Sequence, residues 1–199
     1  MNVAEVGILA LQGDVREHAD AVEAIGGTWK PVRRPDDLVS IDALIIPGGE
    51  STTIGKLAEI YGLIDPLRAA ISGGLPTLGT CAGMIFLATG VTDGIQAQLG
   101  VLDVIIERNA FGRQNESFEA DLAVAGFDEP FRSVFIRAPR VAKVGGGVEV
   151  LAMVAEYPVV VRQGNILAIA FHPELTGDVR IHTMLLQAAE NRCRTDGER

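Results

Sequence analysis

The first 90 residues alternate between apolar runs of strand length and segments whose apolar residues recur at helical spacing. The strand-like runs are residues 3–11, 29–34, 42–47 and 75–80, and helical patterns follow the first, third and fourth of them. This order predicts a mostly parallel central sheet with right-handed crossovers and helices on both faces. No other feature of the chain restricts its possible folds as strongly.

From about residue 97 the pattern changes to short strand-like runs separated by turn residues. We expect these runs to be antiparallel additions to the same sheet. They are residues 99–106, 118–124, 132–138, 149–156 and 158–171. A last helix is predicted over 178–192. The side chains that this helix is expected to bury are Ile181, Met184, Leu185, Ala188 and Ala189. We interpret residues 1–199 as a single α/β domain in which 195–199 form a frayed tail.

Composition narrows the classes of function. With 199 residues, 48% of them hydrophobic, the chain can bury one sizeable core. The net charge of -9 and the lack of any basic cluster longer than Arg33-Arg34 argue against a nucleic-acid partner. The N-terminus has no positive leader, and Gln12 and Asp14 interrupt its apolar run, so we expect no signal peptide and no membrane span. Two cysteines make no disulfide framework, and we expect a cytoplasmic protein with both thiols reduced.

The stretch GTCAGM, residues 79–84, predicts that Cys81 sits on a sharp strand-to-helix turn. In a doubly wound sheet, ligands bind beyond the carboxyl ends of the strands, where this turn must lie. There the following helix stabilises a thiolate, and the backbone N–H of Ala82 points where an oxyanion would form. Gly79 and Gly83 fit because side chains would crowd so tight a turn. The pattern alone leaves two interpretations open, a nucleophile or a small buried hydrophobe.

A thiolate nucleophile needs a base, and the chain has three histidines. His18 and His182 lie beside apolar helical stripes, and we expect both on the surface. His172 ends the strand-like run ILAIAF, because Pro173 after it cannot donate to a strand ladder. Glu174 can accept the imidazole proton and fix its tautomer, the third role of a triad. The alternative is a strand-ending turn with a solvated carboxylate, but a cysteine at another strand end favours catalysis.

The stretch PGGEST, which follows the third strand-like run, is a third candidate part of the site. Its glycines can turn N–H groups toward a ligand, and Gly49 is the expected second oxyanion donor. We expect Ser51 or Thr52 to cap the next helix. Taken alone, the stretch is typical of a tight turn with an N-cap. In the same way, Asp14 and Glu17 predict a capping box at the start of the first helix.

Together and in this order, these pieces resemble the class I (triad) glutamine amidotransferases. Within them the sequence is most similar to the glutaminase subunits of pyridoxal 5'-phosphate synthase, the PdxT family. RNAFGRQ and FIRAP discriminate this family, since the cysteine and HPE elements are shared by the whole superfamily. The matching stretches are GILALQGDVREH at 7–18, PGGEST at 47–52, GTCAGM at 79–84, RNAFGRQNESFE at 108–119, FIRAP at 135–139 and FHPE at 171–174.

The resemblance implies a fold and a role for each matching residue. The fold would be the three-layer glutamine amidotransferase sandwich, and the whole chain one such domain. Cys81 would attack the glutamine carboxamide, His172 would protonate ammonia and later activate water, and Glu174 would orient His172. Gly49 and Ala82 would form the oxyanion hole. The positions that match the family's glutamine-binding residues are Gly49, Glu50, Ser51, Arg108, Ile136 and Arg137.

The resemblance also implies a substrate, L-glutamine, and a partner protein that receives the ammonia. In the family, ammonia passes to a (β/α)₈ barrel, the synthase subunit, which combines it with a pentose phosphate and a triose phosphate to make pyridoxal 5'-phosphate. No cofactor and no metal are implied for this chain, whose sequence has neither a phosphate-binding glycine loop nor a metal-ligand cluster. Residues 12–18 and the RNAFGRQ stretch are the expected places of partner contact.

Three other functions stay open at the level of sequence. A glutaminase feeding another synthase, such as the imidazole glycerol phosphate enzyme, is disfavoured by PGGEST and RNAFGRQ. A stand-alone cysteine hydrolase or peptidase on a similar sheet would act without a partner and without Arg108. A regulatory module with a dead site is disfavoured because Cys81, His172 and Glu174 are all present.

Overall fold

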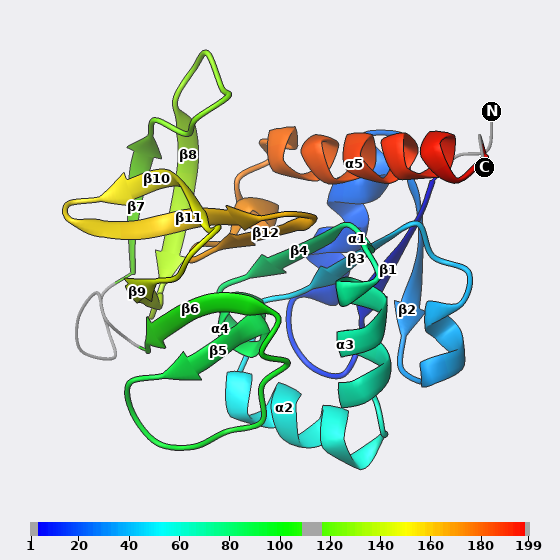
Figure 1. The fold of residues 1–199 in the computed structure, drawn as a ribbon. Helices are drawn as coiled ribbons and strands as arrows, with labels where there is room; N and C mark the ends of the chain where they lie inside the picture. Colours follow the sequence, from blue (N-terminus) through cyan, green and yellow to red (C-terminus); the bar gives the residue numbers. More distant parts are fainter. Residues whose placement is uncertain (1–3, 109–116, 198–199) are drawn as a thin grey trace.

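A seven-stranded sheet forms the centre of the molecule in the computed structural model, which describes residues 4–108 and 117–197, the last three by backbone alone (Figure 1). Its strands, in spatial order, are β10 (Glu149–Val154), β11 (Tyr157–Gln163), β12 (Ile166–Ile169), β4 (Thr77–Thr80), β3 (Ala43–Ile46), β1 (Glu5–Leu9) and β2 (Thr28–Val32). The five strands from β12 to β2 run parallel, whereas β10 and β11 are antiparallel additions at one edge.

Helices cover both faces of this sheet, as the strand and helix alternation predicts. The helices are α1 (Val15–Ala24), α2 (Ser51–Ile60), α3 (Ile64–Ser72), α4 (Ala82–Leu87) and α5 (Arg180–Gly197), with short 3-10 turns η1 (Pro35–Leu38) and η2 (Pro173–Leu175). Figure 1 shows α1 and α5 on one face and α2, α3 and α4 on the other. The last helix, α5, continues to Gly197, beyond the predicted end at residue 192. The sequence analysis did not identify α3.

The central strands are buried on both faces because helices cover both. Every residue of β3, β4 and β12 is buried, and none of the three runs alternates between apolar and polar residues. One cluster of buried apolar side chains extends from Ala4 to Ala189 and includes these strands. The carboxyl ends of β1, β3 and β4 open together at one edge of this core.

The expectation that the strands of the second half are antiparallel additions to the main sheet is confirmed for β10 and β11. β12 also joins the main sheet but runs parallel to β4, and the remaining strands lie outside this sheet. Two small sheets stand apart from the main one, the first built from β5, β6 and β9 and the second from β7 and β8. Their strands are β5 (Ala88–Val91), β6 (Leu102–Glu107), β7 (Ser117–Leu122), β8 (Phe131–Ile136) and β9 (Arg140–Val144). In β6 and β8 every second residue is buried, so only one face of each strand packs on the core. The predicted helix after Cys81 also ends at Leu87, where β5 begins.

Two histidines that were expected on the surface are fully buried. His18 on α1 and His182 on α5 face each other between the two helices that cover one side of the sheet. The buried face of α5 accordingly includes Ile181, His182 and Leu185, whereas Ala188 is exposed. The prediction failed because it treated both imidazoles as polar surface groups.

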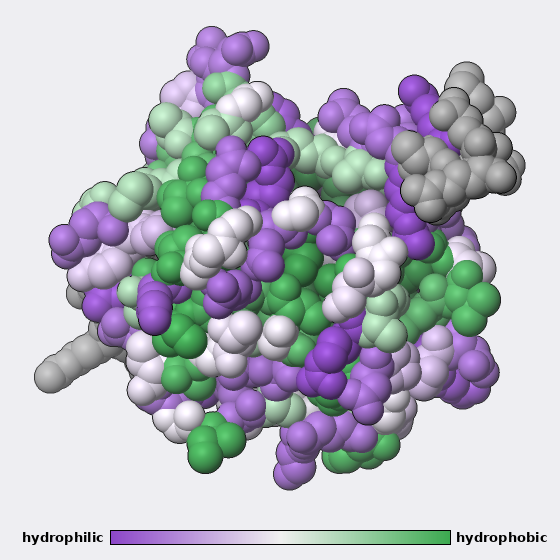
Figure 2. Space-filling model, viewed as in Figure 1, coloured by the Kyte–Doolittle hydropathy of each residue, from purple (hydrophilic) through white to green (hydrophobic). Residues whose placement is uncertain are grey.

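The surface seen in Figure 2 mixes hydrophilic residues with smaller areas of hydrophobic ones. Large exposed apolar side chains include Ile95 and Ile60, which belong to different segments of the chain. Among the described residues, no helix combines the length and the apolar character that crossing a membrane requires.

Candidate active site

Cys81 occupies a strained turn between β4 and α4. Its backbone φ of 47° and ψ of -102° lie in a region that non-glycine residues rarely adopt, at a cost of roughly 1–3 kcal/mol. The Cys81 N–H donates to the Ile169 carbonyl on β12 at 2.8 Å, which ties the turn to the neighbouring strand. The side chain is buried, with 6% of the residue exposed. A cysteine in a strained turn at the end of a parallel strand has the local geometry expected of a nucleophile.

The two glycines around Cys81 are required by close packing, as predicted. A Cβ on Gly79 would lie 2.4 Å from Leu87 Cδ1 and 3.0 Å from the Gly83 backbone. A Cβ on Gly83 would lie 2.0 Å from the Ile46 carbonyl oxygen at the end of β3. Any side chain at either position would therefore force β3, β4 and α4 apart.

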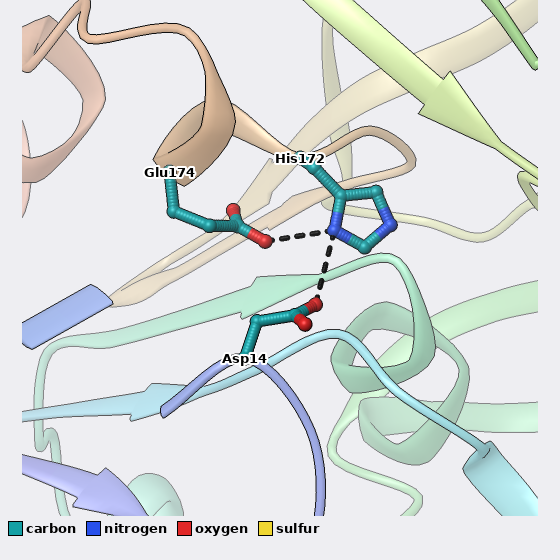
Figure 3. Close-up of side chains that lie close together, drawn as sticks. All are labelled: Asp14, His172 and Glu174. Carbon is teal, nitrogen blue, oxygen red and sulfur yellow. Dashed lines mark hydrogen bonds and ion pairs between the residues drawn. The ribbon is translucent and has the colours of Figure 1, made fainter. Parts of the chain in front are cut away.

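His172 and Glu174 lie at the carboxyl edge of the same sheet, in the turn that leads from β12 into η2 (Figure 3). His172 Nδ1 is 2.7 Å from Glu174 Oε1. Since a carboxylate only accepts, this hydrogen bond places the proton on Nδ1 and leaves Nε2 for the reaction. The Glu174 side chain is completely buried, so its carboxylate is not the solvated group of the alternative interpretation.

Asp14 is a third member of this cluster that the sequence analysis assigned to a different role. Its side chain makes no capping hydrogen bond with α1, so the predicted capping box is wrong. Instead, Asp14 Oδ2 lies 3.3 Å from His172 Nδ1 (Figure 3). A Cβ on Gly48 would come within 2.5 Å of His172 Cε1 and 2.8 Å of Asp14 Oδ2, so only glycine fits between them. The position of Asp14, directly after β1 at the carboxyl edge, was the available signal.

The charges around His172 favour its protonated form. Burial would lower the pKa of His172, but hydrogen bonds with Asp14, Cys81 and Glu174 raise it to about 12. Burial raises the pKa of Glu174, and the hydrogen bond to His172 partly offsets that effect. An imidazolium beside Cys81 stabilises a thiolate nucleophile.

Asp14, His172 and Glu174 could in principle offer ligand atoms to a cation, since these atoms lie within 4.8 Å of one another. The hydrogen bonds of an imidazole between two carboxylates account for this grouping. We assign no metal to it.

The loop after β3 folds differently from its predicted capping pattern. Glu50, and not Ser51 or Thr52, caps α2: its carboxylate accepts from Thr52 N at 3.1 Å and from Thr53 N at 2.7 Å. Burial raises the pKa of Glu50, but a hydrogen bond from the Thr53 hydroxyl at 2.6 Å and those from the two backbone N–H groups lower it below its usual value. The Glu50 N–H donates to Gln12 Oε1 at 2.6 Å, which joins this loop to the segment after β1.

A cavity of about 360 Å³ joins these parts. All predicted site residues except the buried Glu174 line it. They are Gly49, Glu50, Ser51, Cys81, Ala82, Arg108, Ile136, Arg137 and His172. Gln12, Asp14, Ile85 and Leu175 line it as well, and sequence reasoning had not proposed them.

Arg108 is held at the cavity wall by residues of the segment after β5. Its Nη2 lies 2.8 Å from Asp93 Oδ2, and its Nη1 donates to Gln96 Oε1 at 3.0 Å. Gln96 Oε1 also accepts from Ser51 Oγ at 3.2 Å. The hydrogen bond between Asp93 and Arg108 raises the pKa of the arginine and lowers that of the carboxyl. Sequence reasoning missed Asp93 and Gln96, which lie between the helical pattern that ends near residue 90 and the strand-like run that begins at residue 99.

The rest of the predicted RNAFGRQ contact segment, residues 109–114, lies outside the described residues. Arg137, which follows β8, has a φ of 46° and reaches the cavity from the second small sheet. The main sheet therefore supplies Cys81 and His172, whereas the small sheets supply Arg108 and Arg137.

The chain is similar in sequence and in fold to several known proteins. The pyridoxal 5'-phosphate synthase subunit PdxT of Parafrankia sp. is 57% identical over 190 residues, which cover 94% of each chain. The protein of the same name from Streptomyces avermitilis is 54% identical over 189 residues, again 94% of each chain. A crystal structure of a glutamine amidotransferase superposes with a TM-score of 0.89 at 53% identity, over 93% of this chain and 98% of that one.

The predicted fold class is confirmed by structural neighbours of this kind. A glutamine amidotransferase from Thermotoga maritima shares the fold at only 12% identity, with a TM-score of 0.61 over 99% of this chain and 86% of that one. The SNO glutamine amidotransferase family matches residues 8–191. Because this match spans most of the sequence and the relatives are more than half identical over nearly their whole length, the chain belongs to the SNO glutamine amidotransferase family.

Proposed function

We propose that this chain is the glutaminase subunit of a pyridoxal 5'-phosphate synthase, which hydrolyses L-glutamine and passes the ammonia to a synthase subunit. The observation that carries the proposal is the strained Cys81 turn beside the His172–Glu174 hydrogen bond, at a cavity of about 360 Å³. A cavity of this size takes a small ligand. The relatives named PdxT support the choice of synthase.

In the first half of the reaction, the Cys81 thiolate attacks the carboxamide carbon of glutamine. The backbone N–H groups of Gly49 and Ala82 stabilise the oxyanion of the tetrahedral intermediate, since both residues line the cavity beside the sulfur. His172 Nε2 gives its proton to the leaving nitrogen, so ammonia departs and a glutamyl thioester remains.

In the second half, neutral His172 takes a proton from water, and the hydroxide attacks the thioester. Glutamate leaves, and the thiolate and the imidazolium are restored. Throughout, Glu174 Oε1 accepts a hydrogen bond from His172 Nδ1–H, with 2.7 Å between Nδ1 and Oε1. This hydrogen bond keeps Nε2 directed to the reacting atoms.

The opposite wall of the cavity would recognise the amino-acid end of glutamine. Arg108 and Arg137 bring positive charge there, and a guanidinium pairs well with an α-carboxylate. Gly49, Glu50 and Ser51, which follow β3, and Ile136 at the end of β8 also line the cavity.

The partner in the proposed function is the (β/α)₈ barrel of the synthase, which would receive ammonia directly. Residues 12–18 are a suitable contact segment because Gln12 and Asp14 touch the cavity and the loop of Gly49. Neither cysteine forms a disulfide, and a thiolate nucleophile suits a reducing compartment such as the cytoplasm.

The test is glutamate release from glutamine by the purified protein, alone and with a matching synthase subunit. Release stimulated by the partner and lost in Cys81→Ala is expected. Cys193→Ala is the matched control, since Cys193 is exposed on α5, and it should keep wild-type activity. A folded protein that releases no glutamate with an active synthase subunit would contradict the proposal. Equal release with and without the partner would favour a stand-alone hydrolase.

A further inference from the structure

A column of buried polar side chains continues behind the triad, away from the cavity. It consists of Glu174, His18 and His182, with Thr80 beside His18. Glu174 Oε1 accepts from His172, but Glu174 Oε2 is buried and makes no hydrogen bond with the described residues. The nearest basic group is His18 Nε2 on α1, at 3.4 Å, with both side chains fully buried. A buried carboxylate oxygen is unfavourable unless a donor or a positive dipole faces it.

His18 is fixed on both of its ring nitrogens. Its Nε2 lies 3.1 Å from Thr80 Oγ1, on the residue directly before the nucleophile. Its Nδ1 lies 3.0 Å from His182 Nε2 on α5. The His182 side chain is buried too, and its Nδ1 makes no hydrogen bond with the described residues. One imidazole thus touches the strand of the nucleophile and the carboxylate that orients the base.

Only one arrangement of protons suits this column. With the proton of His18 on Nε2, an N–H faces Glu174 Oε2 and Thr80 Oγ1, while Nδ1 accepts from the N–H on His182 Nε2. The opposite tautomer would put the Nε2 lone pair against the carboxylate. It would also leave a buried N–H on His182 Nδ1 without an acceptor, which costs more than an unused lone pair.

We propose that His18 is a positioning residue of the glutaminase site, whose Nε2–H dipole stabilises the far oxygen of Glu174 at 3.4 Å without a direct hydrogen bond, and that His182 keeps His18 in this tautomer. The inference rests on the proposed function and adds a fourth and a fifth residue behind the triad. Neither histidine touches the cavity, so both act through Glu174.

The charge states of the column agree with this role. Burial lowers the pKa of His18 well below its usual value, with smaller contributions from His182 and His172, and burial lowers the pKa of His182 to about 4. The ionisable groups that face His18 are His182 from α5, Glu174 from η2 and, farther away, His172. Both buried imidazoles are therefore neutral at pH 7. They present a dipole to Glu174 without competing with His172 for its charge.

The test compares His18→Leu with His18→Gln, in a Cys193→Ala background so that Cys81 is the only thiol. Leucine fills the space without a donor, whereas a glutamine amide can present an N–H near the position of Nε2. Glutamate release with the synthase subunit should fall about 10- to 100-fold in kcat for His18→Leu, with KM for glutamine changed less than about twofold. His18→Gln should recover most of this loss.

A second measurement follows Cys81 alkylation by iodoacetamide against pH, which needs no glutamine. If Glu174 is no longer held, the imidazolium of His172 is less stable, and the acid limb of the alkylation rate should move to higher pH in His18→Leu. A purely structural role would lower the melting temperature of both variants and leave this limb unchanged, which would overturn the inference.

Thr80→Val separates the two contacts of His18 Nε2. Removing the Thr80 hydroxyl leaves the His18 N–H to Glu174 alone, so kcat should stay within about threefold of the wild type. A loss as large as that of His18→Leu would show that His18 acts on β4 and not on Glu174, and would overturn the inference.

If His18→Leu does not fold, His182→Leu and His182→Gln carry the same comparison one residue farther from the triad. We again expect the Gln variant to keep more activity than the Leu variant. Equal activity of the two variants would overturn the inference. An inactive wild type would contradict the proposed function instead. If the wild type is active and the variants have the same activity as the wild type, only the positioning role is contradicted.

Discussion

One part of the cavity lining, the buried wall, follows strands of the main sheet, whereas another part, the outer wall, follows strands of the small sheets. Cys81 and His172 are each 6% exposed and follow strands that are wholly buried. Arg108 and Arg137 follow β6 and β8, in which only alternate residues are buried. The proposed reacting groups therefore lie on the buried wall and the proposed recognition groups on the more exposed outer wall.

The side chains of the two walls are held in place in different ways. Around Cys81, a Cβ at Gly79 or Gly83 would overlap neighbouring atoms, so the position of the sulfur is fixed by close contact. Arg108 is instead positioned by hydrogen bonds with Asp93 and Gln96, in which the carboxylate is largely exposed. We expect substitutions on the buried wall to change kcat or stability, and substitutions on the outer wall to change KM.

The largest effect is expected for His172→Gln. Glutamine cannot transfer a proton at neutral pH, so kcat for glutamate release should fall on the order of 10³- to 10⁴-fold, with KM nearly unchanged. Steady-state kinetics with the synthase subunit measure both constants. A loss of less than tenfold would remove His172 from the reaction.

The next effect is expected for Gly13→Ala, compared with Gly26→Ala. Both glycines have positive φ angles, 108° and 78°, so alanine is strained at either position. A Cβ at Gly13 would lie 1.7 Å from the Gly48 carbonyl oxygen, whereas at Gly26 it would meet nothing within 4 Å. Gly26→Ala should cost about 1 kcal/mol in free energy of unfolding, and Gly13→Ala roughly 1–3 kcal/mol more.

Urea denaturation measures both glycine variants. Gly13→Ala should also reduce kcat, because Gly48 precedes the expected oxyanion donor Gly49. Equal stability and activity of the two variants would show that the loop after β3 can move aside without consequence.

On the outer wall, Arg108→Gln should raise KM for glutamine about 10- to 100-fold and leave kcat within a few fold, since it removes a charged hydrogen bond to the substrate. Arg132→Gln is the matched control, because Arg132 on β8 pairs with Glu119 and does not line the cavity. The control should not change KM. A fall in kcat alone would place Arg108 with the reacting groups and break the comparison between the two walls.

A further effect is a pH dependence of stability from the histidines behind the buried wall. The unfolded chain protonates His18 and His182 near pH 6.5, whereas the folded chain protonates them only at lower pH, near 4 for His182. Their contribution to stability is therefore complete above pH 6.5 and is lost as the pH falls. Each imidazole should remove up to about 1.4 kcal/mol of unfolding free energy per pH unit.

Glu174 and His172 act in the opposite direction. Burial raises the pKa of Glu174, and hydrogen bonds outweigh burial and raise the pKa of His172, so the folded chain takes up both protons first. Urea denaturation at pH 7 and pH 5 gives the loss in the wild type. The double variant His18→Leu/His182→Leu should show a smaller loss over the same interval. An equal loss would mean that other groups cause the acid sensitivity.

Much of the fold could be predicted because the central strands are continuous apolar runs with turn residues between them. The strands β1, β3 and β4 and the turn at Cys81 follow from this pattern, and the resemblance to glutamine amidotransferases is confirmed by the family match. The small sheets could not be predicted, because a strand-like run does not indicate by itself which sheet it joins. The burial of His18 and His182 was missed because the two imidazoles pair with each other between helices that are far apart in the sequence.

The sequence by itself determined which groups could react and where along the chain they stand. A cysteine between glycines after a buried strand, and a histidine and a glutamate after another, need only local pattern and the rule that parallel strands share one carboxyl edge. The tertiary structure alone decided that Asp14 faces His172 instead of capping α1, that Glu50 caps α2, and that two buried histidines stand behind Glu174. These contacts either join residues as far as 164 positions apart or redirect a side chain that has two possible partners, so only packing selects them.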